Sequence, residues 1–319
     1  EGHTARCVER IASGFSDLDI SVFSQEDMKV IRSLLKGRGF PRGFTRHFSM
    51  DSYSNIRNMC FAAAMLKKAD IVVQIDDDEV IEDPGFMKNA AHSIGKAVSG
   101  NRLLAKTGIY INSEGSWRIK QENPVIREMW LKETAINQAL ESSVLSGKKL
   151  AEITVAFGGN MVIHRDLFAS IPYDPYNTRG EDTDYLVNCM HFGYRFLLDT
   201  ELRVKHIPPR RAAPYWAKMR QDIFRFMYLR EKIRAFGMDP SGLDPYPGAF
   251  LREDLEERVR CTCNNYAMMC REERHIAEAR EWEKNCTSIL ESARRKASRY
   301  SRAYPKFQKD WERFMKILE

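Results

Sequence analysis

Three consecutive aspartates, Asp76-Asp77-Asp78, are the residues of this sequence that most clearly suggest chemistry. They follow residues 71–75, Ile-Val-Val-Gln-Ile, whose apolar and β-branched character predicts a buried strand. Carboxylates crowded at a strand end repel each other unless a cation lies among them, and ligands of open α/β sheets bind at the carboxyl ends of strands. The triplet therefore predicts a divalent-cation site, with a solvated acidic turn as the alternative.

A second group is Gly158-Gly159-Asn160, which lies between two apolar runs at residues 153–157 and 161–163. Paired glycines let a ligand approach the backbone closely, because no Cβ stands in the way. A bare pair more often marks a bulge or a turn, so this motif alone is weak.

Charged residues further along the chain complete the set. Glu181 and Asp182 open a predicted amphipathic helix, where acids in the first turn usually complement the helix dipole. His206 closes an apolar strand; a lone histidine there is more often structural, although neutral imidazole is also a common metal ligand. Arg210 and Arg211 follow closely and suit a phosphate group.

The elements that must position these residues alternate between helix and strand along the first two thirds of the chain. Predicted helices cover residues 4–13, 26–35, 56–68, a segment after 84, 125–145 and a segment from 181. Predicted strands cover residues 20–23, 71–75, 103–111, 153–157, 161–163, 195–198 and 202–206. This alternation is typical of α/β architecture with parallel strands.

After Pro208-Pro209 the composition changes to long, charged helical segments. We therefore divide the chain near Pro214 into an α/β domain of residues 1–213 and a helical extension of residues 214–319. Cys261, Cys263, Cys270 and His275 in the extension lack the paired Cys-x-x-Cys spacing of zinc sites and fall in a predicted helix.

Composition narrows the class of protein. The 319 residues are 43% hydrophobic, enough for one large core, and the formal charge of +6 favours anionic partners without choosing one. The longest apolar stretch, residues 59–66, is far shorter than the about 20 residues of a membrane-spanning helix. Seven scattered cysteines favour reduced thiols, so we expect a cytoplasmic protein.

Basic and aromatic residues are mixed over residues 294–309. A solvated helix face explains this composition most simply, and peripheral membrane contact through the basic C-terminal helices is kept as an expectation. Nucleic acid is the weaker alternative, because no nucleic-acid-binding module accompanies the run.

Taken in chain order, the motifs resemble family 2 glycosyltransferases of the GT-A fold. The resemblance spans roughly residues 5–211. It is carried by residues 69–78, 158–160, 180–184, 193–195 and 206, and the segment Ser54-Asn55-Ile56-Arg57-Asn58 is similar to the family's Arg-Asn segment near the donor. The resemblance implies a GT-A type, Rossmann-like mixed sheet flanked by helices.

It also implies roles for the site residues. Asp76 would contact the donor ribose with help from Asp77, and Asp78 and His206 would hold Mn²⁺ or Mg²⁺ together with Asp76. Gly158, Gly159, Asn160, Arg57, Asn58, Arg210 and Arg211 would bind the donor, a UDP- or GDP-linked sugar. Asp182 would be the base that deprotonates the acceptor hydroxyl. Glu181 would help to position the acceptor or this base.

These roles predict a metal-dependent, inverting nucleotide-sugar transferase whose acceptor is unknown. A retaining glycosyltransferase, a sugar-phosphate nucleotidyltransferase and a non-catalytic nucleotide-sugar binding module stay open as alternatives. Two features depart from the family pattern. The chain begins almost directly with a helix, so the first strand is missing from the sequence, and Phe23-Ser24-Gln25 stands where the family has an aspartate beside the nucleobase.

Overall fold

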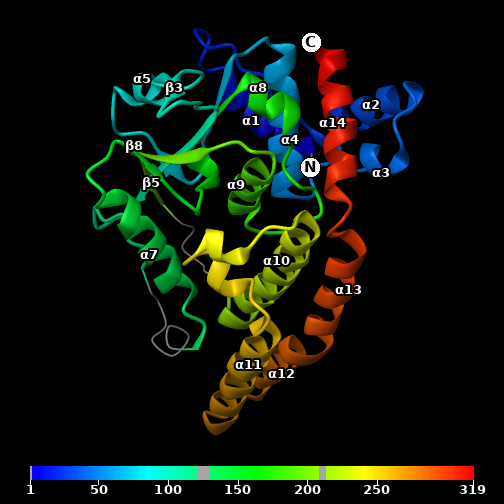
Figure 1. The fold of residues 1–319 in the computed structure, drawn as a ribbon. Helices are drawn as coiled ribbons and strands as arrows, with labels where there is room; N and C mark the ends of the chain where they lie inside the picture. Colours follow the sequence, from blue (N-terminus) through cyan, green and yellow to red (C-terminus); the bar gives the residue numbers. More distant parts are fainter. Residues whose placement is uncertain (1, 121–128, 208–212) are drawn as a thin grey trace.

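A computed structural model of the chain describes residues 2–120, 129–207 and 213–319. Its fold is mixed α/β, with helices on both faces of one main sheet (Figure 1). No helix among these residues combines the length and the apolar character that a membrane span requires.

The main sheet has the strand order β1-β7-β5-β8-β2, and β6 pairs with β8 beside this path. Its strands are β1 (Ile71–Gln74), β2 (Glu79–Val80), β5 (Ala105–Ile111), β6 (Leu150–Glu152), β7 (Met161–His164) and β8 (Phe196–His206). A separate hairpin joins β3 (Ala97–Val98) to β4 (Asn101–Arg102). Among the described residues only β5 and β8 pair in parallel, so the expected sheet is present but mixed and mostly antiparallel.

The helices surround this sheet and extend away from it at the C-terminal end of the chain. They are α1 (Gly2–Ala12), α2 (Gln25–Gly37), α3 (Arg42–Thr45), α4 (Tyr53–Leu66), α5 (Phe86–Ala91), α7 (Lys132–Val144), α8 (Arg165–Ser170), α9 (Glu181–His191), α10 (Tyr215–Phe236), α11 (Leu255–Glu272), α12 (Ile276–Lys284), α13 (Leu290–Tyr300) and α14 (Tyr304–Leu318). Short turns of helix are η1 (Gly158–Asn160), η2 (Pro240–Leu243), η3 (Gly248–Phe250) and η4 (Asn285–Ile289).

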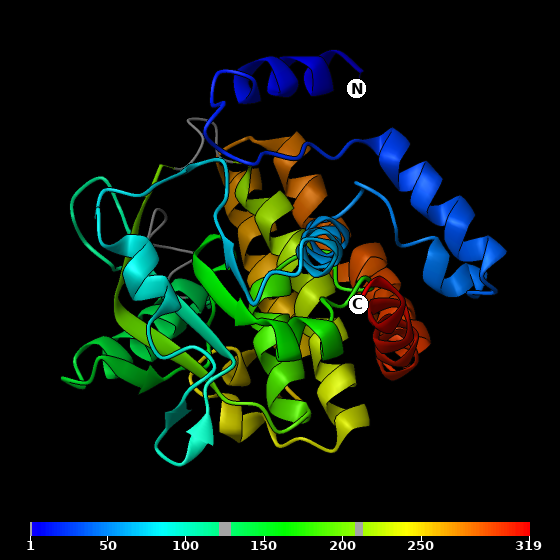
Figure 2. The ribbon, with the colours of Figure 1, turned by 90° about the horizontal axis from the view of Figure 1, so that it is seen from above.

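The C-terminal helices pack on the sheet domain through one shared hydrophobic core (Figure 2). Trp311 of α14 donates a hydrogen bond from its indole nitrogen to the carbonyl of Phe168 at 2.9 Å, and Tyr304 donates from its hydroxyl to the carbonyl of Pro172 at 2.7 Å. The aromatic rings of Phe61 on α4 and Phe168 on α8 stack with centroids 5.4 Å apart. Residues on both sides of Pro214 therefore contribute to the same core.

Four expected strands differ in the structure. Residues 20–23 and 153–157 form no strand, while the two short strands expected at 195–198 and 202–206 are one continuous strand, β8. Among the described residues β1 is an edge strand that pairs only with β7. Residues 20–23 therefore have no neighbouring strand to which their backbone groups could form hydrogen bonds. Ile20 and Phe23 are accordingly 44% and 38% exposed. The helix expected over 125–145 is α7, and residues 125–128 lie outside the described residues.

A buried ionic network holds α9 against α10. The Lys232 ammonium on α10 donates hydrogen bonds to Asp174 at 3.0 Å, to the Asn188 amide oxygen at 2.9 Å and to Asp184, and all four side chains are buried. The Tyr228 hydroxyl also donates to Asp174 at 2.8 Å. One ammonium faces two carboxylates here, and burial raises the pKa of Asp184 to about 7. This network therefore holds α9, the helix that begins with Glu181, in place against α10.

We predict that Lys232→Met lowers the free energy of unfolding by about 3–5 kcal/mol, because it leaves two buried carboxylates without their cation. The loss should grow as pH rises. With Lys232 in place the folded-state pKa of Asp184 is about 7, and Lys232 lowers it. Removing Lys232 raises that pKa further, so the loss is small below the unfolded pKa of about 3.9 and increases as pH rises above it. Urea unfolding at several pH values measures both effects.

The control is the double variant Lys232→Met/Asp184→Asn, which removes one of the stranded carboxylates and should recover part of the lost stability. If Lys232→Met unfolds at the same urea concentration as the unaltered chain at every pH, the network does not stabilise the fold.

Candidate active site

One pocket collects most of the residues that the sequence analysis singled out. Its cavity volume is about 370 Å³, and it lies between the end of β1, η1, the start of α9 and the end of β8. The predicted residues that line it are Arg57, Asp76, Asp77, Asp78, Gly158, Glu181, Asp182 and His206. Segments that are far apart in the sequence therefore meet at one place, as the motifs predicted.

Arg57 connects four of these segments. Its guanidinium is only 7% exposed and donates to both carboxylate oxygens of Asp76 at 3.0 Å and to the carbonyl of Gly158 at 2.9 Å. It also reaches Gln74 and the carboxylate of Glu181, each at 3.4 Å. Such charge-assisted hydrogen bonds are stronger than neutral ones, so Arg57 fixes the relative positions of α4, β1, η1 and α9.

The glycine pair has a packing reason that the sequence did not reveal. A Cβ on Gly158 would lie 2.4 Å from the guanidinium of Arg57, and a Cβ on Gly159 would lie 2.0 Å from the carboxylate of Glu79. Both distances are far below van der Waals contact, so only glycine lets these charged groups lie against the η1 backbone. The Gly159 amide also donates to the Tyr110 hydroxyl at 2.8 Å.

Asp78 and His206 are brought together by strand register. Antiparallel pairing of β2 with β8 sets Glu79 opposite His206, and the Ile207 amide donates to the carbonyl of Asp78 at 2.7 Å. As a result the His206 Nε2 atom lies 3.3 Å from the Asp78 carboxylate, with about a third of each side chain exposed. The Tyr110 ring stacks on the imidazole at 4.9 Å between centroids and fixes its plane. This pair has the geometry of an ion pair or of two neighbouring metal ligands.

The two carboxylates at the start of α9 lie in different surroundings. Glu181 is 8% exposed and bound to Arg57, and burial, followed by the charge of Asp182, raises the pKa of its carboxyl group. Asp182 is partly exposed to the pocket, and its carboxylate accepts a hydrogen bond from the Thr183 amide at 2.7 Å. Gly180 precedes them with a φ of 70°, and a Cβ there would lie 2.8 Å from the guanidinium of Arg225.

Three predicted donor-binding residues of the described structure, Asn58, Gly159 and Asn160, are not among the residues that line the pocket. Asn58 binds the backbone of Tyr173 at 2.9 and 2.7 Å, and the buried Asn160 amide donates to backbone carbonyls of β5 and β8. The side chains of Asn58 and Asn160 therefore bind the protein backbone next to the pocket and do not face into it. Arg210 and Arg211 lie outside the described residues.

Sequence reasoning missed three groups that do line the pocket. Arg179 precedes α9 and lies over the Tyr53 ring at 5.7 Å, and Arg225 of α10 lies over the Tyr246 ring at 5.5 Å. Tyr110, described above, is the third. The sequence analysis identified residues 214–319 only as charged helical segments, so no sequence signal separated Arg225 from its neighbours.

The charge of the pocket suits a cation. Among its described lining residues are five carboxylates and three guanidinium groups, so a bound divalent ion would balance the excess negative charge. No three His, Cys, Asp or Glu side chains in the described part of the chain are grouped to hold a metal by themselves. Asp78 and His206 supply two ligands of types that metal ions accept, leaving the other positions to a bound ligand and water.

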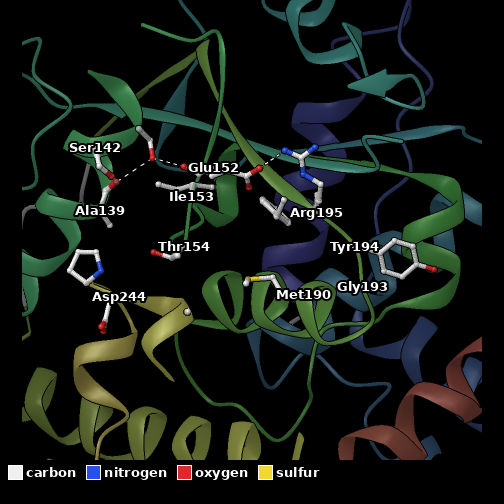
Figure 3. Close-up of a pocket in the computed structure, with 14 residues that line it drawn as sticks. Ala139, Ser142, Glu152, Ile153, Thr154, Met190, Gly193, Tyr194, Arg195 and Asp244 are labelled. Atoms are coloured by element: carbon white, nitrogen blue, oxygen red, sulfur yellow. Dashed lines mark hydrogen bonds and ion pairs between the residues drawn. The ribbon is translucent and has the colours of Figure 1, made fainter. Parts of the chain in front are cut away.

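A second pocket of about 480 Å³ is lined by residues of α7, α9 and the segment that follows β6, Ile153 and Thr154 among them (Figure 3). Its polar groups mostly bind one another. The Ser142 hydroxyl donates to the carbonyl of Ala139 at 2.9 Å, and Arg195 bonds to the carboxylate of Glu152. It carries no cluster of carboxylates like the one around Asp78, so it is the weaker candidate for a catalytic site.

Comparison with known proteins returns no family model that matches this chain and no curated protein that matches its sequence.

We predict that Gly159→Ala lowers the free energy of unfolding by about 1–3 kcal/mol, because the new methyl group overlaps the Glu79 carboxylate. Adding Glu79→Ala should restore much of the loss by making room. Thermal or urea unfolding of the two variants measures the difference.

Gly43→Ala is the matched control, since a Cβ at that position meets nothing within 4 Å. A Gly159→Ala chain as stable as the control would show that the close approach of Glu79 to η1 does not occur in solution.

Proposed function

We propose that this protein is a metal-dependent glycosyltransferase that moves a sugar from a nucleotide-diphosphate donor to an acceptor hydroxyl with inversion. The observation that carries the proposal is the meeting, in one pocket, of the aspartate triplet, Gly158, the Glu181-Asp182 pair and His206. The order of these motifs along the chain resembles family 2 glycosyltransferases, and their spatial meeting is what that chemistry needs.

The donor side of the pocket is the part around Asp78 and His206. A divalent cation bound there would stabilise the negative charge that builds up on a departing diphosphate. Arg179 and Arg225 are cations in the same pocket that can bind phosphate oxygens. Arg57 is already paired with Asp76 and Glu181, so we assign it to positioning the site rather than to the diphosphate.

The acceptor side is the part around Asp182. A general base must have a carboxylate that is exposed to the reacting hydroxyl and is not held by a cation. Asp182 meets this requirement better than Glu181, because Glu181 is buried against Arg57. The Asp182 carboxylate would accept the proton of the acceptor hydroxyl as its oxygen attacks the anomeric carbon. Attack from that side, opposite the leaving diphosphate, inverts the configuration.

We predict that Asp78→Ala abolishes the dependence of UDP or GDP binding on Mn²⁺, because one of the two protein ligands is lost. Thermal-shift measurements with each nucleotide, with and without Mn²⁺, test this. A ligand at 100 times its dissociation constant adds about 2.7 kcal/mol of apparent stability.

The matched control for Asp78→Ala is Asp17→Ala, which removes an exposed carboxylate away from the pocket. If Asp78→Ala binds the nucleotide with unchanged affinity and an unchanged response to Mn²⁺, the metal assignment is wrong.

We predict that Asp182→Asn lowers kcat by about 100-fold or more while donor affinity stays nearly constant, because asparagine keeps the shape but cannot accept the proton. Release of UDP or GDP from nucleotide sugars measures turnover, with water as the acceptor where no other is known. The comparison variant Glu181→Gln should instead weaken donor binding, since it changes the group that Arg57 holds.

Near-normal turnover of Asp182→Asn would remove this residue as the base. A product that keeps the donor's anomeric configuration, determined by NMR, would favour the retaining alternative instead.

A further inference from the structure

A basic pocket lies between α2 and α3, on helices that sit beside α14 (Figure 1). Its cavity volume is about 410 Å³, and none of its described lining residues belongs to the candidate active site. Five of them are cationic, Lys29, Arg32, Lys36, Arg42 and Arg46, and none is a carboxylate. Like charges around one hollow repel each other, and an anion inside the hollow would relieve that repulsion.

Most of this positive charge has no counter-charge in the described structure. Arg32, Lys36 and Arg42 form no ion pair or hydrogen bond through their side chains with any described residue. The Lys29 ammonium pairs only with Glu26, one turn away on the exposed surface, at 2.6 Å. Salt bridges of this exposed kind are weak, so the pocket keeps a strong positive potential.

The remaining cation, Arg46, binds a neutral partner. Its guanidinium donates to the His47 ring at 3.1 Å, and burial together with the charge of Arg46 lowers the pKa of His47 to about 4. At neutral pH this histidine therefore carries no charge, and the contact leaves the positive charge of Arg46 in place.

Thr45 gives a second, independent sign of a ligand. This residue lines the pocket and is only 1% exposed, yet its Oγ1 atom has no hydrogen-bond partner among the described residues. Buried hydroxyl groups in folded proteins nearly always have a partner. The hydroxyl is closed off from the hollow in the conformation described, and rotation about the χ1 torsion of Thr45 would be needed to bring it to an oxygen atom of a ligand there.

The walls of the pocket are held rigidly by the core. Met28 and Leu35 bury one face of α2, and the Phe44 ring of α3 stacks on Phe40 at 5.2 Å and lies 5.1 Å from the Phe307 ring of α14. The backbone positions that carry the cations are thus set before any ligand arrives, while the cationic side chains themselves are mostly exposed.

We propose that this pocket binds the phosphate groups of a phosphorylated small molecule or of a phospholipid headgroup. Arginine side chains match phosphate oxygens in geometry and charge, and the hydroxyl of Thr45 can donate to the same group. The volume exceeds what a single phosphate needs, so the ligand carries more than one phosphate or a larger body. This binding does not depend on the proposed glycosyl transfer.

Inorganic pyrophosphate is the probe, titrated calorimetrically into the full chain in buffer with EDTA and constant ionic strength. Without a divalent cation the carboxylates of the candidate active site repel pyrophosphate, so the measured binding reports on the basic pocket. We expect Arg32→Gln/Lys36→Gln to weaken binding by roughly 10-fold or more. The control Lys148→Gln/Arg280→Gln removes two exposed cations elsewhere and should leave the affinity unchanged.

Thr45→Val tests the pocket without changing its charge. It should weaken pyrophosphate binding several-fold while leaving the melting temperature of the ligand-free chain unchanged or higher, because valine replaces a buried hydroxyl that has no partner. Equal affinity of this variant and the unaltered chain, equal affinity of the double variant and its control, or no binding of pyrophosphate at millimolar concentrations would each overturn the proposal.

Sedimentation with vesicles identifies the source of the phosphate. Binding to phosphatidic acid vesicles but not to phosphatidylcholine vesicles, lost in Arg32→Gln/Lys36→Gln, would identify a lipid headgroup. Pyrophosphate binding without vesicle binding would identify a free phosphorylated compound.

Discussion

The geometry of the candidate active site depends on one buried guanidinium, that of Arg57. A cation that is 7% exposed must be compensated by carboxylates, and Asp76 and Glu181 supply them from two elements far apart in the sequence. The same group also binds the Gly158 carbonyl, so the strand end, the glycine turn and the start of α9 meet around a single charge. Removing this charge would leave Asp76 and Glu181 repelling each other, since no other cationic side chain among the described residues forms an ion pair with either of them.

This arrangement divides the carboxylates of the pocket into two groups. Asp76 and Glu181 are neutralised by Arg57 and serve the framework. Among the described residues, His206 is the only side chain with a basic group that pairs with Asp78, and none pairs with Asp182; both aspartates line the pocket. A ligand would therefore meet the uncompensated negative charge of the pocket at two separated points, Asp78 and Asp182. Separation of this kind is what a reaction needs when one point holds a cation beside a leaving group and the other accepts a proton.

The parts of this site that depend on local sequence could be predicted, and those that depend on tertiary contacts could not. The apolar run that precedes Asp78 and its neighbouring aspartates predicts a strand with carboxylates at its end. The 3.3 Å approach of His206 to Asp78 depends on the register of β2 against β8, which no local pattern contains. The need for glycine at position 159 comes from Glu79, which approaches from another strand. Arg225 reaches the pocket only because α10 packs across the start of α9.

The distribution of charge says more about ligands than its total does. A formal charge of +6 favours anions in general, yet the pocket around Asp78 has an excess of carboxylates and the pocket around Arg32 has only cations among its described lining residues. Folding gathered like charges at both places against their mutual repulsion. Repulsion that is stored in a preformed hollow is released when an ion of the opposite sign enters. If both proposals hold, the first pocket would therefore take a cation and the second an anion.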